Sequence, residues 1–251
     1  MDLRLDGRVA LVTGASGGLG AHVAGVLAAA GARVVLGARR LASLEERAAA
    51  IGPGAMPVAL DVTDDASVEA ALDAAERAFG PVDVLVNNAG VVEVGRDPLT
   101  IVPDEMRRVL EVNVTGAFRL TQAVASRLVA AGRGGAVVNV ASILGLDVET
   151  GTPAYCASKA ALVQLTKQQA LDLAPHRIRV NALAPGYVET DLNRAFLRSE
   201  AGRSMAARIP AGRIGRLEDF DAPLLLLASD AGAYITGAVL PVDGGHLVRG
   251  L

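Results

Sequence analysis

The sequence predicts one α/β domain, a parallel sheet covered by helices on both faces. Short apolar runs rich in Val, Leu and Ala alternate with helical patterns along most of the 251 residues. The hydrophobic content of 51% suits strands that are buried on both faces. No linker-like change of composition interrupts the alternation, so a single domain spanning residues 1–251 is expected.

Each element has a local signal. Apolar runs predict seven strands, at residues 8–14, 31–40, 55–62, 81–86, 134–142, 177–183 and 238–242. Helical spacing predicts helices at residues 16–30, 41–51, 65–79, 103–131, 152–173 and 217–229. Pro103 followed by Asp104 and Glu105 fits a helix start, and Gly52-Pro53-Gly54 ends the second helix. Strands and helices alternating at this spacing imply parallel pairing through right-handed crossovers. Residues 187–216 are the least regular, which is typical of a functional lid or of disorder.

Composition and charge argue against several classes of protein. No apolar run approaches the ~18 residues of a membrane span, and residues 1–6 lack a signal-peptide core, so a cytoplasmic protein is expected. The net charge of −3, the absence of a basic run and the 3% aromatic content argue against nucleic-acid binding. The three histidines are scattered, without metal-ligand spacing. The single cysteine, Cys156, excludes an internal disulfide and is interpreted as a small helix filler, not a reactive thiol.

A glycine-rich turn follows the first strand. Residues 13–20 read TGASGGLG and place Gly14, Gly18 and Gly20 between a buried strand and a helix. Glycines let the backbone approach a phosphate, and a helix N-terminus offers unpaired N–H groups to an anion. The turn indicates dinucleotide binding, although the glycines alone would also suit an ordinary tight turn.

The end of the second strand favours NADP over NAD. Dinucleotide folds place an acidic residue there for the adenosine ribose, whereas this chain has Arg39 and Arg40. A charge-assisted bond from Arg39 to a 2′-phosphate would contribute about 1.5–3 kcal/mol, roughly a 10- to 150-fold preference. The alternative is that both arginines bind no cofactor and are solvent-exposed residues at the start of the next helix.

Two polar residues stand in otherwise apolar segments. Asn113, followed by Gly116, lies inside the predicted helix 103–131. The two residues mark either a kink, at which backbone groups lose their helical hydrogen bonds, or two poor helix formers that a regular helix tolerates. Ser142 ends the strand 134–142 at the carboxyl edge of the sheet, where ligands bind in open α/β folds. Alone, Ser142 would be a simple turn residue.

Tyr155 and Lys159 are the strongest catalytic candidates. They are four residues apart in the predicted helix 152–173, so they share one helix face. A phenol has a pKa of about 10, and an ammonium one turn away favours the phenolate. The pair is a plausible general acid/base, although such pairs also occur on solvated helix faces.

Together these stretches resemble the short-chain dehydrogenase/reductase family along nearly the whole chain. The matching stretches are TGASGGLG (13–20), LDV (60–62), NNAG (87–90), Asn113, Ser142, YCASK (155–159), PG (185–186) and VDGG (242–245). Bacterial ketoreductases and gluconate dehydrogenases look closest. The resemblance implies a doubly wound, seven-stranded Rossmann fold and an oxidoreductase that uses NADP(H), with NAD(H) possible. It also implies a homotetramer (or homodimer) built through residues 104–131 and 152–173.

The resemblance implies catalytic roles for Asn113, Ser142, Tyr155 and Lys159. Tyr155 would exchange a proton with the substrate oxygen, which Ser142 would hold and polarise. Lys159 would bind the nicotinamide ribose and lower the pKa of Tyr155, while Asn113 would position a water that links Lys159 to solvent. Cofactor contacts are implied at Gly14, Ser16, Gly18, Leu19, Gly20, Arg39, Asp61, Val62, Asn88, Ala89, Gly90, Tyr155, Lys159, Pro185, Gly186, Val188 and Thr190. Because Gly17 stands where many NADP-using relatives carry a basic residue, Arg39 would supply most of the NADP selectivity.

The substrate is left open by the sequence. Ketone or aldehyde reduction, reversible as alcohol oxidation, is the leading interpretation, with β-ketoacyl thioesters, sugar acids or small hydrophobic ketones as substrates. Candidate pocket residues in and before the expected substrate loop, 187–216, are Asp147, Glu149, Tyr187, Arg194 and Phe196. The alternatives are a non-catalytic NAD(P)-binding redox sensor or regulatory protein, and an isomerase or epimerase, which would usually need a larger C-terminal domain.

Overall fold

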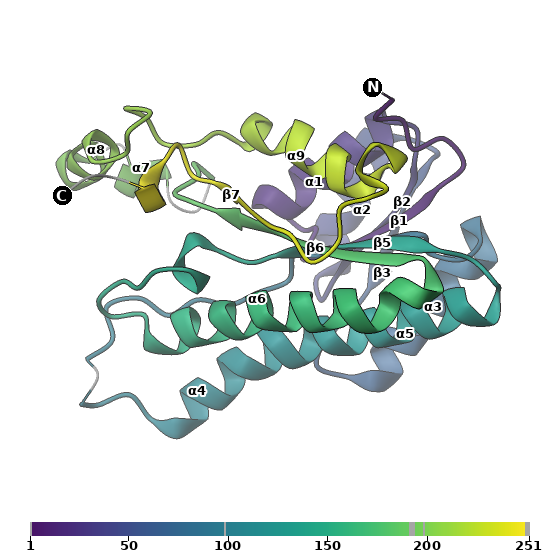
Figure 1. Ribbon diagram of the computed structural model, residues 1–251, viewed down its shortest axis with the longest axis horizontal. Coiled ribbons are helices and arrows are strands. Elements are labelled where there is room, and N and C mark those ends of the chain that lie inside the picture. The colour runs from purple at the N-terminus through teal and green to yellow at the C-terminus, as the bar shows by residue number, and fades with distance from the viewer. Residues whose placement is uncertain (1, 98, 191–193, 198, 249–251) are drawn as a thin grey trace.

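The computed structural model describes residues 2–97, 99–190, 194–197 and 199–248, except for the side chains of residues 196 and 201. All strands in this part of the chain join one parallel sheet in the order β3-β2-β1-β4-β5-β6-β7 (Figure 1). The bounds are β1 (Val9–Thr13), β2 (Arg33–Ala38), β3 (Ala55–Ala59), β4 (Val84–Asn87), β5 (Gly135–Val140), β6 (Ile178–Pro185) and β7 (Val239–Val242). The predicted fold class, a doubly wound seven-stranded parallel sheet, is confirmed.

Helices cover both faces because the central strands are apolar on both sides. The helices α1 (Gly18–Ala29), α2 (Leu41–Ile51) and α9 (Asp221–Ala228) pack on one face, and the core between them contains Leu27, Leu44 and Leu224. The other face carries α3 (Asp65–Phe79), α5 (Gly116–Ala130) and α6 (Pro153–Leu173). Their core includes Leu72 and Leu120. Figure 1 shows the two layers above and below the sheet.

Two predicted segments differ from the structure. The expected helix 103–131 is divided into α4 (Pro103–Leu110), a π-helical turn (Glu111–Thr115) and α5. The interruption lies where the Asn113 side chain forms hydrogen bonds to the backbone of Val91. The π-turn resolves the alternative left open at Asn113 and Gly116, since it is a local interruption and not a tolerated pair in a regular helix. Residues 187–216, expected to be irregular, contain the short helices α7 (Arg194–Leu197) and α8 (Glu200–Ala207). The side chain of Ser199 caps α8 by accepting a hydrogen bond from the backbone N–H of Gly202.

The carboxyl ends of β1 and β4 form the point at which the sheet order reverses. Crossovers run outward from β1 to β2 and β3, and the chain then returns to place β4 on the other side of β1. The side-chain amide of Asn88 donates to the carbonyl of Thr13 at 2.9 Å and so ties the two strand ends together. Ligands of open α/β sheets bind outside the strands at such a switch point.

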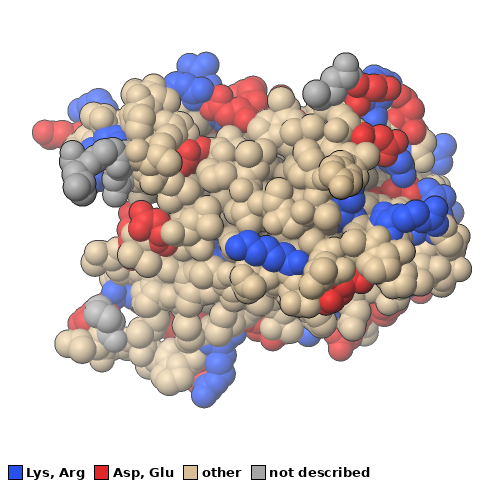
Figure 2. Space-filling model, in the orientation of Figure 1, with Lys and Arg blue, Asp and Glu red and all other residues tan. Residues whose placement is uncertain are grey.

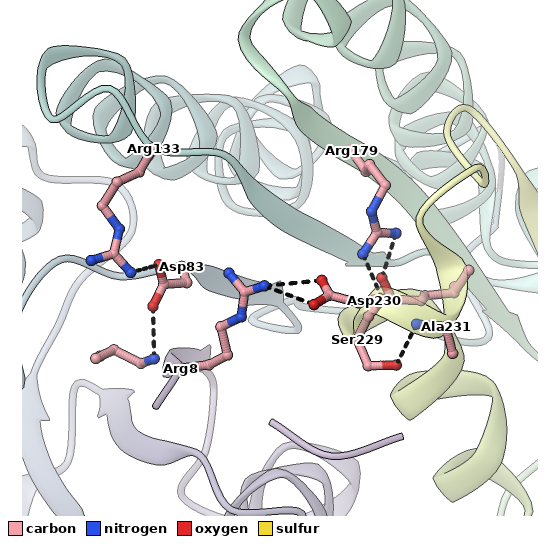
Figure 3. Close-up of polar contacts among 9 residues, drawn as sticks. Arg8, Asp83, Arg133, Arg179, Ser229, Asp230 and Ala231 are labelled. Carbon is pink, nitrogen blue, oxygen red and sulfur yellow. Dashed lines mark hydrogen bonds and ion pairs between the residues drawn. The ribbon is translucent and has the colours of Figure 1, made fainter. Parts of the chain in front are cut away.

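The opposite, amino edge of the sheet is closed by polar contacts. Asp83, only 1% exposed, accepts a hydrogen bond from the backbone of Val9 and pairs with Arg133. Arg8 pairs with Asp230 beside it (Figure 3). In the same view Arg179 donates to backbone carbonyls at the end of α9, including that of Ser229. The buried carboxylate of Asp83 is thus hydrogen-bonded and paired, as a structural role requires.

Two classes of site receive no support from the part of the chain that the structure describes. None of its helices is both long and apolar enough to cross a membrane. It also contains no group of three or more His, Cys, Asp or Glu side chains that could hold a metal ion.

Candidate active site

The turn from β1 to α1 has the geometry of an anion-binding cradle. Gly14 and Gly18 have φ angles of 67° and 54°, which L side chains rarely adopt. A Cβ at Gly20 would lie 2.4 Å from the carbonyl oxygen of Gly14, so only glycine fits there. No side chain caps the N-terminus of α1 and no acidic residue lies in its first turn. Its first N–H groups and the positive end of its dipole are therefore available to a phosphate.

The loop after β4 faces this turn. The hydroxyl oxygen of Thr13 accepts hydrogen bonds from the backbone N–H groups of Asn88 (3.0 Å) and Ala89 (2.9 Å). Gly90 comes next, and a Cβ there would lie 3.3 Å from Asn113 Oδ1 and 3.7 Å from Lys159 Nζ. The predicted residues of the two loops are thus neighbours in space. Ser16 is half-buried in the first loop.

Asp61 and Arg39 lie close enough to interact electrostatically. Asp61 Oδ1 accepts hydrogen bonds from the backbone N–H and the hydroxyl of Thr63, and these bonds lower the pKa of Asp61. Arg39 is exposed and forms no hydrogen bond or ion pair within the described ranges. Its guanidinium also contributes to the lowered pKa of Asp61. Val62 beside Asp61 packs on Gly116, where a Cβ would lie 2.7 Å from the Val62 side chain.

The π-turn holds Asn113 in a fixed orientation. Asn113 is 1% exposed. Its Oδ1 accepts from the backbone N–H of Val91 at 2.8 Å, and its Nδ2 donates to the carbonyl of Val91 at 2.9 Å. Nδ2 also donates to the hydroxyl of Ser158 at 3.0 Å. The amide is therefore an anchor for the loop after β4, a role that the sequence did not indicate.

Ser142, Tyr155 and Lys159 meet at the carboxyl ends of β5 and β6. Ser142 is 7% exposed, and its oxygen accepts a hydrogen bond from the backbone N–H of Leu144. Tyr155 and Lys159 lie one turn apart on α6, with the Lys159 ammonium 5.5 Å from the centre of the Tyr155 ring. Lys159 donates to the carbonyl of Val140 at 2.7 Å. The predicted grouping is observed.

The pKa of Tyr155 is shifted in the direction opposite to the one expected from its spacing to Lys159. Burial raises the pKa of Tyr155, and a hydrogen bond from Ser142 only partly opposes this rise. Burial also lowers the pKa of Lys159 to about 8. The net shift is upward because desolvation is its largest cause, and the lowering of the Tyr155 pKa by Lys159 stays a prediction.

These side chains border a cavity of about 300 Å³. Its wall combines the catalytic candidates with segments that follow β1, β4, β5 and β6, namely Leu19, Asn88, Gly90, Val91, Val92, Val140, Ala141, Ser142, Tyr155, Lys159, Pro185, Gly186, Tyr187 and Val188. Thr190 lies beside the glycine turn, since a Cβ at Gly18 would be 3.7 Å from its methyl group. The left edge of the molecule is indented in Figure 2, between the lobe that carries α7 and α8 and the loops below it.

The candidate pocket residues have mixed outcomes. Tyr187 lines the cavity and donates to Glu149. Arg194 donates to Glu189 at 2.8 Å, while the exposed Asp147 accepts from the backbone of Val148. The side chain of Phe196 lies outside the described residues. Cys156 is buried with its sulfur 3.2 Å from the Thr152 hydroxyl, as a helix filler would be.

Sequence reasoning missed the segment 91–93. Val91 and Val92 line the cavity, and Glu93 beside them is buried without a hydrogen-bond partner among the described residues. The run VVEV has no motif that would have marked it. Its start is held by the long-range hydrogen bonds between Val91 and Asn113.

Comparison with known proteins agrees with this geometry. A family profile described as enoyl-(acyl carrier protein) reductase matches residues 14–246. A sorbitol dehydrogenase of Cereibacter sphaeroides is 38% identical over 255 residues, covering 97% of this chain and 99% of that protein. A cis-4-hydroxycyclohexanecarboxylate dehydrogenase of Sinomonas cyclohexanicum is 42% identical, with 95% and 96% covered. The crystal structure of a gluconate 5-dehydrogenase from Burkholderia cenocepacia, in complex with NADP and tartrate, has a TM-score of 0.90 at 38% identity, with 98% and 97% covered.

Proposed function

Because the chain belongs to the short-chain dehydrogenase/reductase family of oxidoreductases, we propose that it transfers a hydride between NADP(H) and a ketone or secondary alcohol. The observation that carries this proposal is the meeting of Ser142, Tyr155 and Lys159 at one cavity. That cavity lies at the carboxyl edge of the sheet and also receives Leu19 from the glycine turn. A cofactor phosphate held by that turn and a carbonyl held by Tyr155 would therefore be neighbours.

The residues present fit a dinucleotide. The uncapped N-terminus of α1 and the positive φ angles of Gly14 and Gly18 suit the pyrophosphate. Asp61 and Val62 would border the adenine. The remaining contacts would come from Ser16, Leu19, Gly20, Asn88, Ala89 and Gly90 around the phosphates and ribose, and from Tyr155, Lys159, Pro185, Gly186, Val188 and Thr190 around the nicotinamide. When bound, the nicotinamide supplies the hydride chemistry.

Arg39 supports NADP as the preferred cofactor, with NAD still accepted. Its guanidinium is exposed and has no ion-pair partner in the described part of the chain, so it is available to a 2′-phosphate. The neighbouring carboxylate of Asp61 is held in its own turn by Thr63. NADP bound to the gluconate 5-dehydrogenase of similar structure agrees with this choice.

Tyr155 would act as the proton donor in reduction and the acceptor in oxidation. Its raised pKa keeps the proton on the phenol at neutral pH. Tyr155 would therefore be in the protonated form that a general acid needs to donate to a carbonyl oxygen. Ser142 would donate a second hydrogen bond to the negative charge that grows on that oxygen. Lys159 would stabilise the phenolate left after transfer, since with a pKa of about 8 it is mostly charged at pH 7.

Asn113 would support this chemistry indirectly, through the backbone that its side chain holds in place. Its side-chain amide is occupied by Val91 and Ser158. A water that links Lys159 to solvent would then bind the backbone carbonyls of the π-turn, which departs from regular helical pairing.

The assembly and location are also proposals. Exposed apolar residues on α5 and α6, including Phe118, Val129 and Leu171, suit packing against another copy in a homotetramer or homodimer. The face drawn in Figure 2 has large uncharged areas around one central basic patch, and many of its other charged residues lie toward the periphery. Light scattering that gives a monomer would refute the assembly. Cytoplasmic location and a single domain over residues 1–251 agree with the composition.

The experiment is a cofactor and carbonyl screen. NADPH and NADH are followed by absorbance against a β-ketoacyl thioester, 5-ketogluconate, a diketone and an aryl ketone, with Tyr155→Phe as the control. We expect turnover with NADPH that is lost in the variant. Tight NADPH binding with no turnover of any carbonyl would favour the alternative, a redox sensor or regulatory protein. The complete set of catalytic residues supports the enzyme over that alternative.

A further inference from the structure

Polar side chains are buried between the sheet and the helices α5 and α6. Asn87 at the end of β4 and Asn139 in β5 are register partners in the sheet. Thr121 on α5 and Thr166 on α6 contact them, and Asn139 and both threonines are 0% exposed. A buried polar group costs free energy unless it is hydrogen-bonded, so the bonds of these side chains indicate what holds them there.

Hydrogen bonds join these four side chains into one network. The Nδ2 of Asn87 donates to the Oδ1 of Asn139 at 2.9 Å and to the hydroxyl of Thr121 at 3.0 Å. The Nδ2 of Asn139 donates to the hydroxyl of Thr166 at 2.9 Å. That hydroxyl in turn donates to the carbonyl of Leu162 at 2.8 Å. Such directional bonds specify one arrangement of α6 on the sheet more sharply than apolar contacts do.

The same strand and helix hold Lys159. Its ammonium donates to the carbonyl of Val140, which follows Asn139 in β5. Thr166 follows Lys159 by seven residues, about two helical turns, so both side chains lie on the sheet-facing side of α6. Helix α6 is thus attached to β5 at two neighbouring residues of the strand. Loss of one attachment changes how the helix approaches the other.

The burial of Lys159 depends on this fit between helix and strand. Lys159 is 4% exposed, and burial lowers its pKa to about 8. Lysine is almost never fully buried unless it is paired, and here the Val140 carbonyl accepts its hydrogen bond. If α6 moved away from β5, this bond would lengthen and water would reach the ammonium. The pKa of Lys159 would then rise toward its ordinary value of 10.5.

We propose that Asn139 and Thr166 are positioning residues, whose hydrogen bond sets the place of α6 on β5 and thereby the position of Lys159. The inference rests on the proposed hydride transfer, in which Lys159 stabilises the Tyr155 phenolate. Asn139 and Thr166 do not line the cavity of about 300 Å³, so they act through α6. Thr121 belongs to the same network but lies on α5, so its bond contributes to stability and not to the placement of Lys159.

The test compares the same substitution at the two threonines. Thr166→Val and Thr121→Val each remove one hydroxyl from a fully buried position and keep the shape of the side chain. Both should lower the Tm by roughly 2–8 °C, because each deprives an asparagine N–H of that acceptor. Only Thr166→Val should lower kcat for ketone reduction, by about tenfold or more, since it displaces reacting groups. The pH above which the rate falls should rise by about one unit in Thr166→Val and stay unchanged in Thr121→Val.

A second measurement needs no turnover. The sequence contains two lysines, Lys159 and Lys167, and Lys167 is exposed on the same helix. Acetic anhydride modifies neutral amines, so the labelling of each lysine across a pH series, measured by mass spectrometry, reports the pKa of Lys159 against Lys167 as the internal reference. We expect a Lys159 midpoint of about 8 in the wild type and in Thr121→Val, and a higher midpoint in Thr166→Val.

Thr166→Ser separates the hydroxyl from the packing of the side chain. It keeps the hydroxyl and loses one methyl group, so it should retain the wild-type midpoint and kcat. The same changes in Thr166→Ser as in Thr166→Val, an unchanged Lys159 midpoint in Thr166→Val, or equal losses of kcat in Thr166→Val and Thr121→Val would each overturn the positioning role. Turnover by the wild type that depends on Tyr155 would still support the proposed function in those cases. If the wild type reduces no ketone, the proposed function fails, and the labelling alone decides whether the network positions Lys159.

Discussion

Asn113 offers the most quantitative prediction, because the structure shows all of its side-chain bonds. Asn113→Ala removes the two bonds to Val91, of 2.8 and 2.9 Å, and the 3.0 Å bond to Ser158. Leaving a buried polar group unpaired costs about 1–3 kcal/mol. Val91 is only partly buried, so water can replace part of the loss, and a total of about 2–4 kcal/mol is expected. For a chain of this size that corresponds to a Tm lowered by about 4–16 °C.

The assay combines thermal unfolding with separate values of kcat and KM. Because Asn113 anchors the segment that lines the cavity, we expect KM to rise together with the fall in Tm. Asn113→Asp keeps the acceptor for the Val91 N–H but places a carboxylate oxygen against the Val91 carbonyl, so it should not restore stability. Gln168→Ala is the control, an exposed amide that bonds to Asp172 on the same helix. An Asn113→Ala protein with wild-type Tm and KM would refute the anchoring role.

Three further predictions concern the cofactor and the acid/base pair. Arg39→Ala should weaken NADPH binding by about 10- to 150-fold and NADH binding much less; equal losses in a fluorescence titration would exclude a 2′-phosphate contact. The rate of carbonyl reduction should be steady below pH 8 and fall above it, because Lys159, with a pKa of about 8, loses the charge that stabilises the Tyr155 phenolate. A rate that does not fall from pH 8 to 10 would contradict this role. Gly20→Ala should abolish cofactor binding, since its Cβ would lie 2.4 Å from a backbone oxygen, whereas Gly25→Ala in the same helix meets no atom within 4 Å and should be tolerated.

The fold was predictable where local pattern and tertiary packing agree. Apolar runs marked the strands, and the predicted helix 65–79 has the observed bounds of α3, with the Asp64 side chain as its cap. The π-turn was only suggested, because the register of a helix at Asn113 depends on Val91, 22 residues away in sequence. The helices α7 and α8 were missed because eight residues or fewer show too little periodicity to be recognised.

The residues of the candidate site could be predicted from the sequence, but the effect of burial on their pKa values could not. The spacing of Tyr155 and Lys159 correctly placed both on one face of α6. It did not reveal their burial, which reverses the expected shift of the Tyr155 pKa. Glu93 was missed for the same reason, since a lone acid between valines normally points to solvent.

Deuterium transfer tests the central claim most directly. NADPH carrying deuterium on the transferable position of the nicotinamide is incubated with the best ketone of the screen, and the alcohol product is analysed by mass spectrometry. The account predicts one deuterium on the carbinol carbon with wild-type protein, and no product with Tyr155→Phe. Alcohol formed without the label, or labelled alcohol formed equally well by Tyr155→Phe, would contradict direct hydride transfer assisted by Tyr155.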